Sequence, residues 1–283
     1  MREKIYNKVY GDSVLILLFF SICFLPLSVH AQNYIQTLEN GSIDWSNGVI
    51  EATGIGQPPK QPINPAHARA KAEYDAIFEA RSRLLALILG IQVDSVHQVK
   101  DLIRDSESVL QKIKHYLQYS RVVDISYPSD GSVKARVSLM LTSAFADLVL
   151  PSTIRVIQPI KQKTVSETHN GDYTGFIIDC SGLKVKPSMI PKIIDEEGHE
   201  VYGPVNVSRN YAIHRTLTGY IKGIRAAEKD PKVAHKPLII KGVGPAKTGP
   251  SDIIISNADA EKVRGDAHNL LLLQKCKIII VLD

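Results

Sequence analysis

The chain has 283 residues and a formal net charge of +5 at pH 7, with basic and acidic side chains interspersed along its length. A charge this small and this evenly spread argues against a nucleic-acid-binding protein, in which basic residues gather on one surface. Aromatic residues make up only 6%, with a single tryptophan, so a carbohydrate platform built from several rings is not expected. The length suffices for two modest domains.

Residues 1–31 have the pattern of an export signal. A basic start precedes an almost uninterrupted apolar run over residues 14–27, and a signal peptidase site ends at Ala31. We predict cleavage between Ala31 and Gln32. The apolar run is shorter than the about 20 residues that a membrane-spanning helix needs, which leaves an uncleaved membrane anchor as the alternative.

The three cysteines bear on where the mature chain resides. Cys23 lies inside the apolar run and lacks the residues of a lipidation site, so we expect no lipid anchor. No later stretch is long and apolar enough to span a bilayer, and we predict a periplasmic or secreted protein. Cys180 and Cys276 would remain after cleavage, either joined in a disulfide or as two buried thiols.

Residues 45–150 predict an α+β domain with the order β-α-α-β-β. The expected elements are a strand over 49–54, a Gly/Pro-rich loop over 54–62, a helix over 64–90, a second helical segment over 95–117, and strands over 122–127 and 133–141. Asn64 and Pro65 are typical of a helix start, and Gly90 of a helix end. Asp94 or Ser95 is expected to cap the second helical segment.

A weakly patterned stretch over 151–172 predicts a linker, and residues 173–283 predict a second α+β domain. Its expected elements are strands over 174–180, 192–195 and 200–202, a helix over 208–227, strands over 238–243 and 253–255, a helix over 257–273 and a final strand over 277–282. We therefore predict the α+β class, with two small domains that each hold a mainly antiparallel sheet with helices packed on it.

Searches for catalytic and ligand-binding motifs are negative. Gly54-Ile55-Gly56 lacks the third glycine of a dinucleotide fingerprint, and residues 242–248 lack the last glycine of a phosphate-binding loop. The histidines do not have the spacing of zinc ligands, and residues 195–198 lack the alternating oxygen ligands of a calcium loop. We predict no catalytic residues, no cofactor and no metal, and therefore no enzyme.

The region of about 45–141 resembles the LPP20-like lipoprotein domain and the similarly built N-terminal domain of the flagellar assembly protein T. The resemblance lies in residues 49–56, in Ala68-Arg69-Ala70-Lys71-Ala72 and in the closing hairpin. It implies a fold of this type and transfers no catalytic residues. Lipoprotein members are lipidated on a cysteine that this chain lacks, and the uncharacterised C-terminal region resembles segments that accompany such domains in secreted proteins.

We expect a non-catalytic periplasmic cell-envelope protein, a structural or assembly component that contacts envelope or flagellar proteins. Residues 54–62 and the surface between the domains are the candidate contacts. The alternative is a secreted binding protein or hydrolase with a site between the two domains. A pocket there, lined by two or more buried ionisable groups with shifted pKa values, would favour the alternative. The sequence leaves the oligomeric state open.

Overall fold

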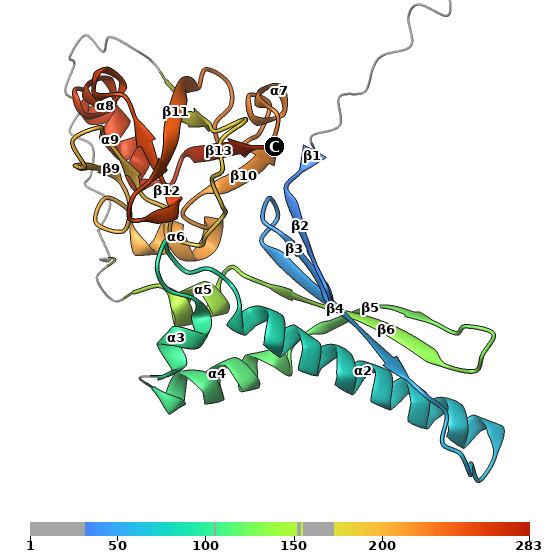
Figure 1. Ribbon diagram of the computed structural model, residues 1–283. Helices are drawn as coiled ribbons and strands as arrows, with labels where there is room; N and C mark the ends of the chain where they lie inside the picture. Colours follow the sequence, from blue (N-terminus) through green and yellow to red (C-terminus); the bar gives the residue numbers. More distant parts are fainter. Residues whose placement is uncertain (1–31, 105, 152–153, 155–172) are drawn as a thin grey trace, which may run out of the picture. The chain divides into compact units, whose positions relative to one another are not determined.

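The computed structural model describes residues 32–104, 106–151, 154 and 173–283, and it contains two domains that are each built on one sheet (Figure 1). The first sheet is antiparallel and the second is mixed, with helices packed on both. The α+β class and the two-domain arrangement predicted from the sequence are confirmed. The predicted linker over 151–172 lies almost wholly outside the described residues.

The first domain has a five-stranded sheet with the order β2-β3-β4-β6-β5, in which all neighbours are antiparallel. Its strands are β2 (Ile35–Leu38), β3 (Gly41–Asp44), β4 (Val49–Gly56), β5 (Arg121–Ser126) and β6 (Val133–Met140). Its helices are α2 (Pro65–Leu89), α3 (Val99–Arg104), α4 (Glu107–Leu117) and α5 (Ala144–Val149). The hairpin of β2 and β3 precedes the predicted domain start and adds two strands that the sequence pattern did not indicate.

Helix α2 begins and ends where its sequence predicts. The Asn64 side chain accepts a hydrogen bond of 2.8 Å from the backbone N–H of His67, and Pro65 occupies the first turn, where no N–H partner is needed. At the other end, the backbone N–H of Gly90 donates to Ala86 at 3.3 Å and to Leu87 at 3.1 Å. In Figure 1 the helix runs along the sheet beside β4 and β6.

Small residues allow α2 to lie unusually close to β4. Ala72, Ala76 and Ala80 are spaced by four residues, so they share one face of the helix, and all three are fully buried. They face Gly54 and Gly56, where an added Cβ would lie within 2.3 Å of the helix backbone. The predicted loop over 54–62 is therefore wrong at its start, because β4 continues to Gly56 and packs against the helix.

The second domain has an eight-stranded sheet with the order β1-β10-β13-β7-β11-β12-β8-β9. Its strands are β1 (Gln32–Asn33), β7 (Phe176–Asp179), β8 (Ile193–Ile194), β9 (Glu200–Tyr202), β10 (Gly219–Lys222), β11 (Leu238–Ala246), β12 (Gly249–Ile255) and β13 (Ile278–Leu282). Its helices are α6 (Arg209–Arg215), α7 (Ile224–Ala227), α8 (Asn257–Arg264) and α9 (Ala267–Gln274). Strands β10, β13, β7 and β11 are mutually parallel.

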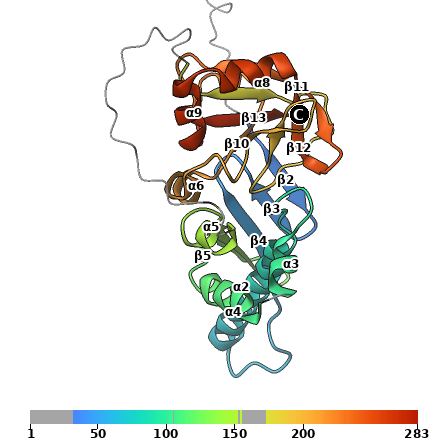
Figure 2. The same cartoon turned by 90° about the vertical axis from the view of Figure 1, so that its left-hand side faces the viewer.

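The central parallel strands are buried on both faces. All five residues of β13 are buried, and alternate residues belong to different apolar clusters, Ile278 and Ile280 to one and Ile279 and Val281 to the other. Helix α7 contributes to the second cluster, and α8 and α9 to the first. Figure 2 shows α8 and α9 beside the strands of this sheet. A continuous apolar run is what a strand covered on both faces requires. The predicted burial of the C-terminal run in a sheet is confirmed.

Two long helices expected in this domain are interrupted. The segment over 208–227 is divided into α6, β10 and α7, with Gly219 opening the strand and Gly223 at φ 80°, outside the helical region. The segment after 257 is divided into α8 and α9, which are separated by Gly265 and Asp266. Ser256 caps α8 and accepts a hydrogen bond of 3.1 Å from the N–H of Asp259.

Backbone hydrogen bonds join the two domains. The N–H of Met189 donates to Gln92 at 3.0 Å, and the N–H of Ile190 donates to Val93 at 2.8 Å. The ring of Trp45 lies edge-on to that of Tyr220, with centroids 5.7 Å apart. None of the helices in the described parts of the chain combines the length and apolar character that crossing a membrane requires.

Candidate functional site

A polar groove of about 610 Å³ lies between one loop of the first domain and three segments of the second. The loop is residues 94–97, and the other walls are β8 with the 195–198 turn, the turn between β11 and β12, and the adjoining part of β12. Ionisable side chains dominate the lining: Asp94, His97, Lys192, Asp195, Glu196, Glu197, Glu200, Lys247 and Asp252. Six carboxylates against two lysines give the lining a formal charge of −4 with His97 neutral. We call it the acidic groove.

Asp94 organises the wall from the first domain. Its carboxylate accepts hydrogen bonds of 2.8 Å from the backbone N–H groups of Val96 and His97, and it lies 3.1 Å from the His97 ring. Burial alone would raise the pKa of Asp94, but these N–H groups and the His97 ring outweigh it and lower the pKa. Asp94 therefore closes its own loop and does not cap a helix, because α3 begins only at Val99.

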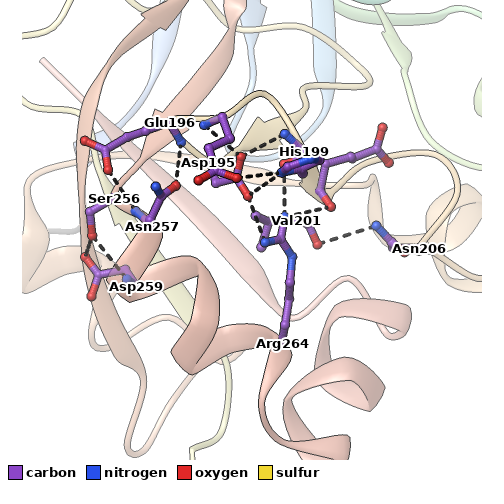
Figure 3. Close-up of polar contacts among 11 residues, drawn as sticks. Asp195, Glu196, His199, Val201, Asn206, Ser256, Asn257, Asp259 and Arg264 are labelled. Carbon is purple, nitrogen blue, oxygen red and sulfur yellow. Dashed lines mark hydrogen bonds and ion pairs between the residues drawn. The ribbon is translucent and has the colours of Figure 1, made fainter.

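Asp195 organises the opposite wall, between β8 and β9 (Figure 3). Its side chain is 4% exposed, and Oδ1 accepts backbone hydrogen bonds from Glu197 at 3.1 Å and His199 at 2.8 Å. Oδ2 accepts 2.8 Å from Nη1 of Arg264 and lies 3.3 Å from Nδ1 of His199. Burial would raise the pKa of Asp195, but the Arg264 and His199 hydrogen bonds and the charge of Arg264 lower it to about 2.

The Asp195 turn is attached to both ends of α8, as Figure 3 shows. At the start of the helix, the N–H of Asn257 donates to Glu196 Oε2 and the N–H of Glu196 donates to Asn257 Oδ1, both at 3.1 Å. At its end, Nη2 of Arg264 donates to the carbonyls of His199 at 3.1 Å and Glu200 at 3.3 Å. The turn is thus held at two points on one rigid element.

The direction of these pKa shifts limits the chemistry of the groove. A carboxylic acid that donates a proton near neutral pH needs a raised pKa, as in many catalytic acids. Asp94 and Asp195 have lowered pKa values and are stable anions whose oxygens bind groups of the protein itself. Among the residues that the structure describes, no three histidine, cysteine, aspartate or glutamate side chains are grouped so as to hold a metal ion. Asp94 and Asp195 therefore hold the walls of the groove as ionised carboxylates.

The two remaining cysteines are buried and far apart. Strands β7 and β13 are parallel, with Phe176 paired to Ile278, so Cys180 follows the end of one strand and Cys276 precedes the start of the other. The register separates them by six residues along the strands, about 20 Å at 3.3 Å per residue. A disulfide requires Cα atoms within about 7 Å. In the structure the two cysteines are not joined in a disulfide, and burial raises the pKa of Cys180 to about 12.

The predicted cleavage site lies at the edge of the described chain. Ala31 is outside the described residues, whereas Gln32 begins β1 and pairs with Lys222 of β10. The acidic groove itself was missed by sequence reasoning. Asp195 and Arg264 are 69 residues apart, and nothing in the spacing indicated that they would meet.

Comparison with known protein families finds a match for each domain. Residues 37–148 match the model described as Treponema pallidum Tp0624, N-terminal domain, and residues 175–283 match the model described as Treponema pallidum Tp0624, second domain. The resemblance of the first domain to LPP20-like lipoproteins and to the flagellar assembly protein T is therefore wrong. A comparison with curated proteins gives no match.

Proposed function

We propose that this chain, whose two domains match in order the N-terminal and second domains of Tp0624, is a non-catalytic cell-envelope protein that acts through protein–protein contacts. The observation that supports this proposal is the acidic groove. Its two most strongly held carboxylates are ionised and bound within the protein, so they shape a charged surface and are not available as a catalytic acid and base. Flagellar partners are not part of the proposal, since they depended on the overturned resemblance.

Export is the first part of the proposal to test. Expression of the full chain in a bacterium, followed by fractionation and N-terminal sequencing, should give a periplasmic or secreted product that begins at Gln32. Ala31→Phe should leave the precursor uncleaved, because the position before the cut accepts only small residues. Asn33→Ala, two residues away, should be processed normally. A full-length product in the cytoplasmic fraction would contradict the export step.

Contact through the acidic groove is the second part. A photocrosslinking amino acid at Val96, which is 68% exposed on the rim, should form a discrete adduct in intact envelopes. Glu197→Lys should abolish this adduct by reversing a charge of the lining. Glu228→Lys is the matched control, because it makes the same charge change at an exposed position outside the lining.

An adduct that survives Glu197→Lys, or that appears equally from a probe at the exposed Ile63, would show that the groove does not select the partner. Loss of the adduct with both Glu197→Lys and Glu228→Lys would show that net charge matters and the groove does not. Either outcome contradicts the proposed role of the acidic groove.

The second hypothesis, a secreted binding protein or hydrolase with a site between the domains, has one observation in its favour. The acidic groove lies where that hypothesis places a site, and two of its carboxyl groups have shifted pKa values. Both shifts are downward, which favours binding of a cationic ligand over hydrolysis. Calorimetric titration with a lysine-rich peptide should show binding that weakens with salt and with Glu197→Lys. The absence of heat at low salt would remove this second hypothesis.

A further inference from the structure

One edge strand of the first sheet is exposed along nearly its whole length. Strand β5 ends that sheet and has β6 as its neighbour on one side (Figure 1). Five of its six residues are exposed, including the apolar Val122 at 41% and Val123 at 48%. The strands at the other three sheet ends have only two to four residues. Among the described strands, β5 therefore offers the longest row of edge N–H and C=O groups.

A β-bulge at Val123 brings the two charged side chains of β5 to the same face of the sheet. Arg121 pairs with Ser138 and Asp124 pairs with Arg136, and these two residues of β6 lie on the open face, opposite the buried face that packs on α2. Residues three apart in a regular strand point to opposite faces. Because the bulge inserts one residue, Arg121 and Asp124 share the open face.

The order of these charges makes the strand complementary to itself. Charged residues on an edge strand usually hinder pairing with another chain. In an antiparallel pair with a twofold axis between Val122 and Val123, however, Arg121 of each copy lies opposite Asp124 of the other, and Val122 lies opposite Val123. Opposite charges and β-branched side chains are favourable in such cross-strand positions. Asp124 also pairs with Arg136 of its own sheet, so one row across the joined sheets alternates in charge.

We propose that β5 is a self-association site, at which two copies of this chain join their first-domain sheets into one continuous antiparallel sheet. The charge complementarity selects a second copy as the occupant of the edge. A shift of the two strands by two residues in either direction would leave Arg121 and Asp124 opposite uncharged side chains, so the charges also select the register. The self-association does not use the acidic groove and is independent of the proposed function.

Charge reversal at the two positions tests the pairing. The purified protein should sediment as a dimer at about 100 μM, where an interface with a Kd of about 1 μM is largely filled. Arg121→Asp alone and Asp124→Arg alone should each be monomeric, because each places like charges opposite one another. An equimolar mixture of the two variants should form dimers again, since every arginine at these positions then meets an aspartate across the axis.

The matched control is Lys134→Asp, which reverses a charge on the same open face but on β6, one strand in from the edge. It should leave the dimer intact. A monomer of the unsubstituted protein at about 100 μM, or a mixture of the two variants that stays monomeric, would overturn the proposal. Loss of the dimer in Lys134→Asp would show that net charge governs association, and it would overturn the pairing of Arg121 with Asp124.

Hydrogen exchange tests whether the contact lies on β5. The amides of residues 121–126 should exchange more slowly in the dimer than in the Arg121→Asp monomer, whereas those of β2, at the other end of the sheet, should not change. A dimer that protects other residues and not these would contradict the proposal. A monomer whose β5 amides become protected only when envelope proteins are added would assign the edge to a different protein, and it would overturn self-association.

Discussion

The close contact between β4 and α2 predicts that one methyl group will destabilise the first domain. In Gly56→Ala the new Cβ would lie 1.8 Å from the carbonyl oxygen of Ala72 and 2.7 Å from the backbone nitrogen of Ala76. An ordinary contact begins at 3.4 Å, so the helix backbone must retreat by about 1.6 Å. Rotation of a side chain cannot relieve the clash, because both nearest atoms belong to the backbone.

The expected loss follows from two opposing effects. Overpacking of a close-packed core costs about 1–3 kcal/mol and more when the backbone must move. Replacing glycine by alanine raises the free energy of unfolding by about 0.5–1 kcal/mol, because alanine restricts the unfolded chain. We therefore expect Gly56→Ala to lower the free energy of unfolding by about 2 kcal/mol, and Gly54→Ala, whose Cβ would lie 2.3 Å from the Ala76 carbonyl, to have a similar effect.

Urea unfolding followed by circular dichroism measures this change as a lower midpoint with an unchanged slope. Gly244→Ala is the matched control, because an added Cβ there has no atom within 4 Å and the residue is not in the left-handed region. It should change the free energy of unfolding by no more than about 0.5 kcal/mol. If Gly56→Ala is as stable as Gly244→Ala, the strand and helix are not in the close contact described.

Three further predictions concern single groups. Arg264→Met removes the charged partner of Asp195 and should destabilise the protein at pH 7. Because the pKa of Asp195 is lowered to about 2, its stabilising effect is complete above about pH 4 and is lost as the pH falls toward 2. The difference between Arg264→Met and the unsubstituted protein in thermal melts should therefore shrink over that range, and a constant difference would contradict it. Iodoacetamide at pH 8 should leave Cys180 unmodified in the folded protein, as judged by mass spectrometry, whereas an exposed Val205→Cys should react. Asn64→Ala should cost about 1 kcal/mol in urea unfolding by removing the cap of α2, whereas Asn64→Asp should retain most of it.

Features that depend on a single segment could be predicted from the sequence. The distant segments with which they pair or pack could not. The cap at Asn64, the end of α2 at Gly90 and the alternation of β6 follow from local rules, and the structure contains all three. Two glycines already weakened the predicted helix over 208–227. The strand β10 forms there because it pairs with β13, about 60 residues further along the chain. Strands β2 and β3 show little apolar alternation. They form a hairpin at the sheet edge because β3 pairs with β4.

The incorrect family resemblance has a physical explanation. Its signature joined the glycines of residues 54–56 to an alanine-rich helix, and the structure shows that both are needed for one close strand–helix contact. Any domain that packs a helix this closely on a strand favours small residues on both sides, whatever its ancestry. The pattern therefore predicted the contact between the elements correctly, although it identified the family wrongly.

The acidic groove could not be predicted for a related reason, and the same reason favours a role in binding. Its charged turn is held by Asn257 and Arg264, which are far from Asp195 in the sequence and are brought to it by α8. The opposing loop is held by the Asp94 carboxylate and by the Gln92 side chain, which donates to the carbonyls of Asp94 at 2.6 Å and His97 at 3.2 Å. Because both walls are ordered by internal hydrogen bonds before any partner arrives, a partner would lose little binding energy to ordering them. Asp94 and Asp195, the carboxylates with this internal role, have lowered pKa values and stay ionised at neutral pH. They give the groove a rigid, charged surface, which supports the proposal of a contact site.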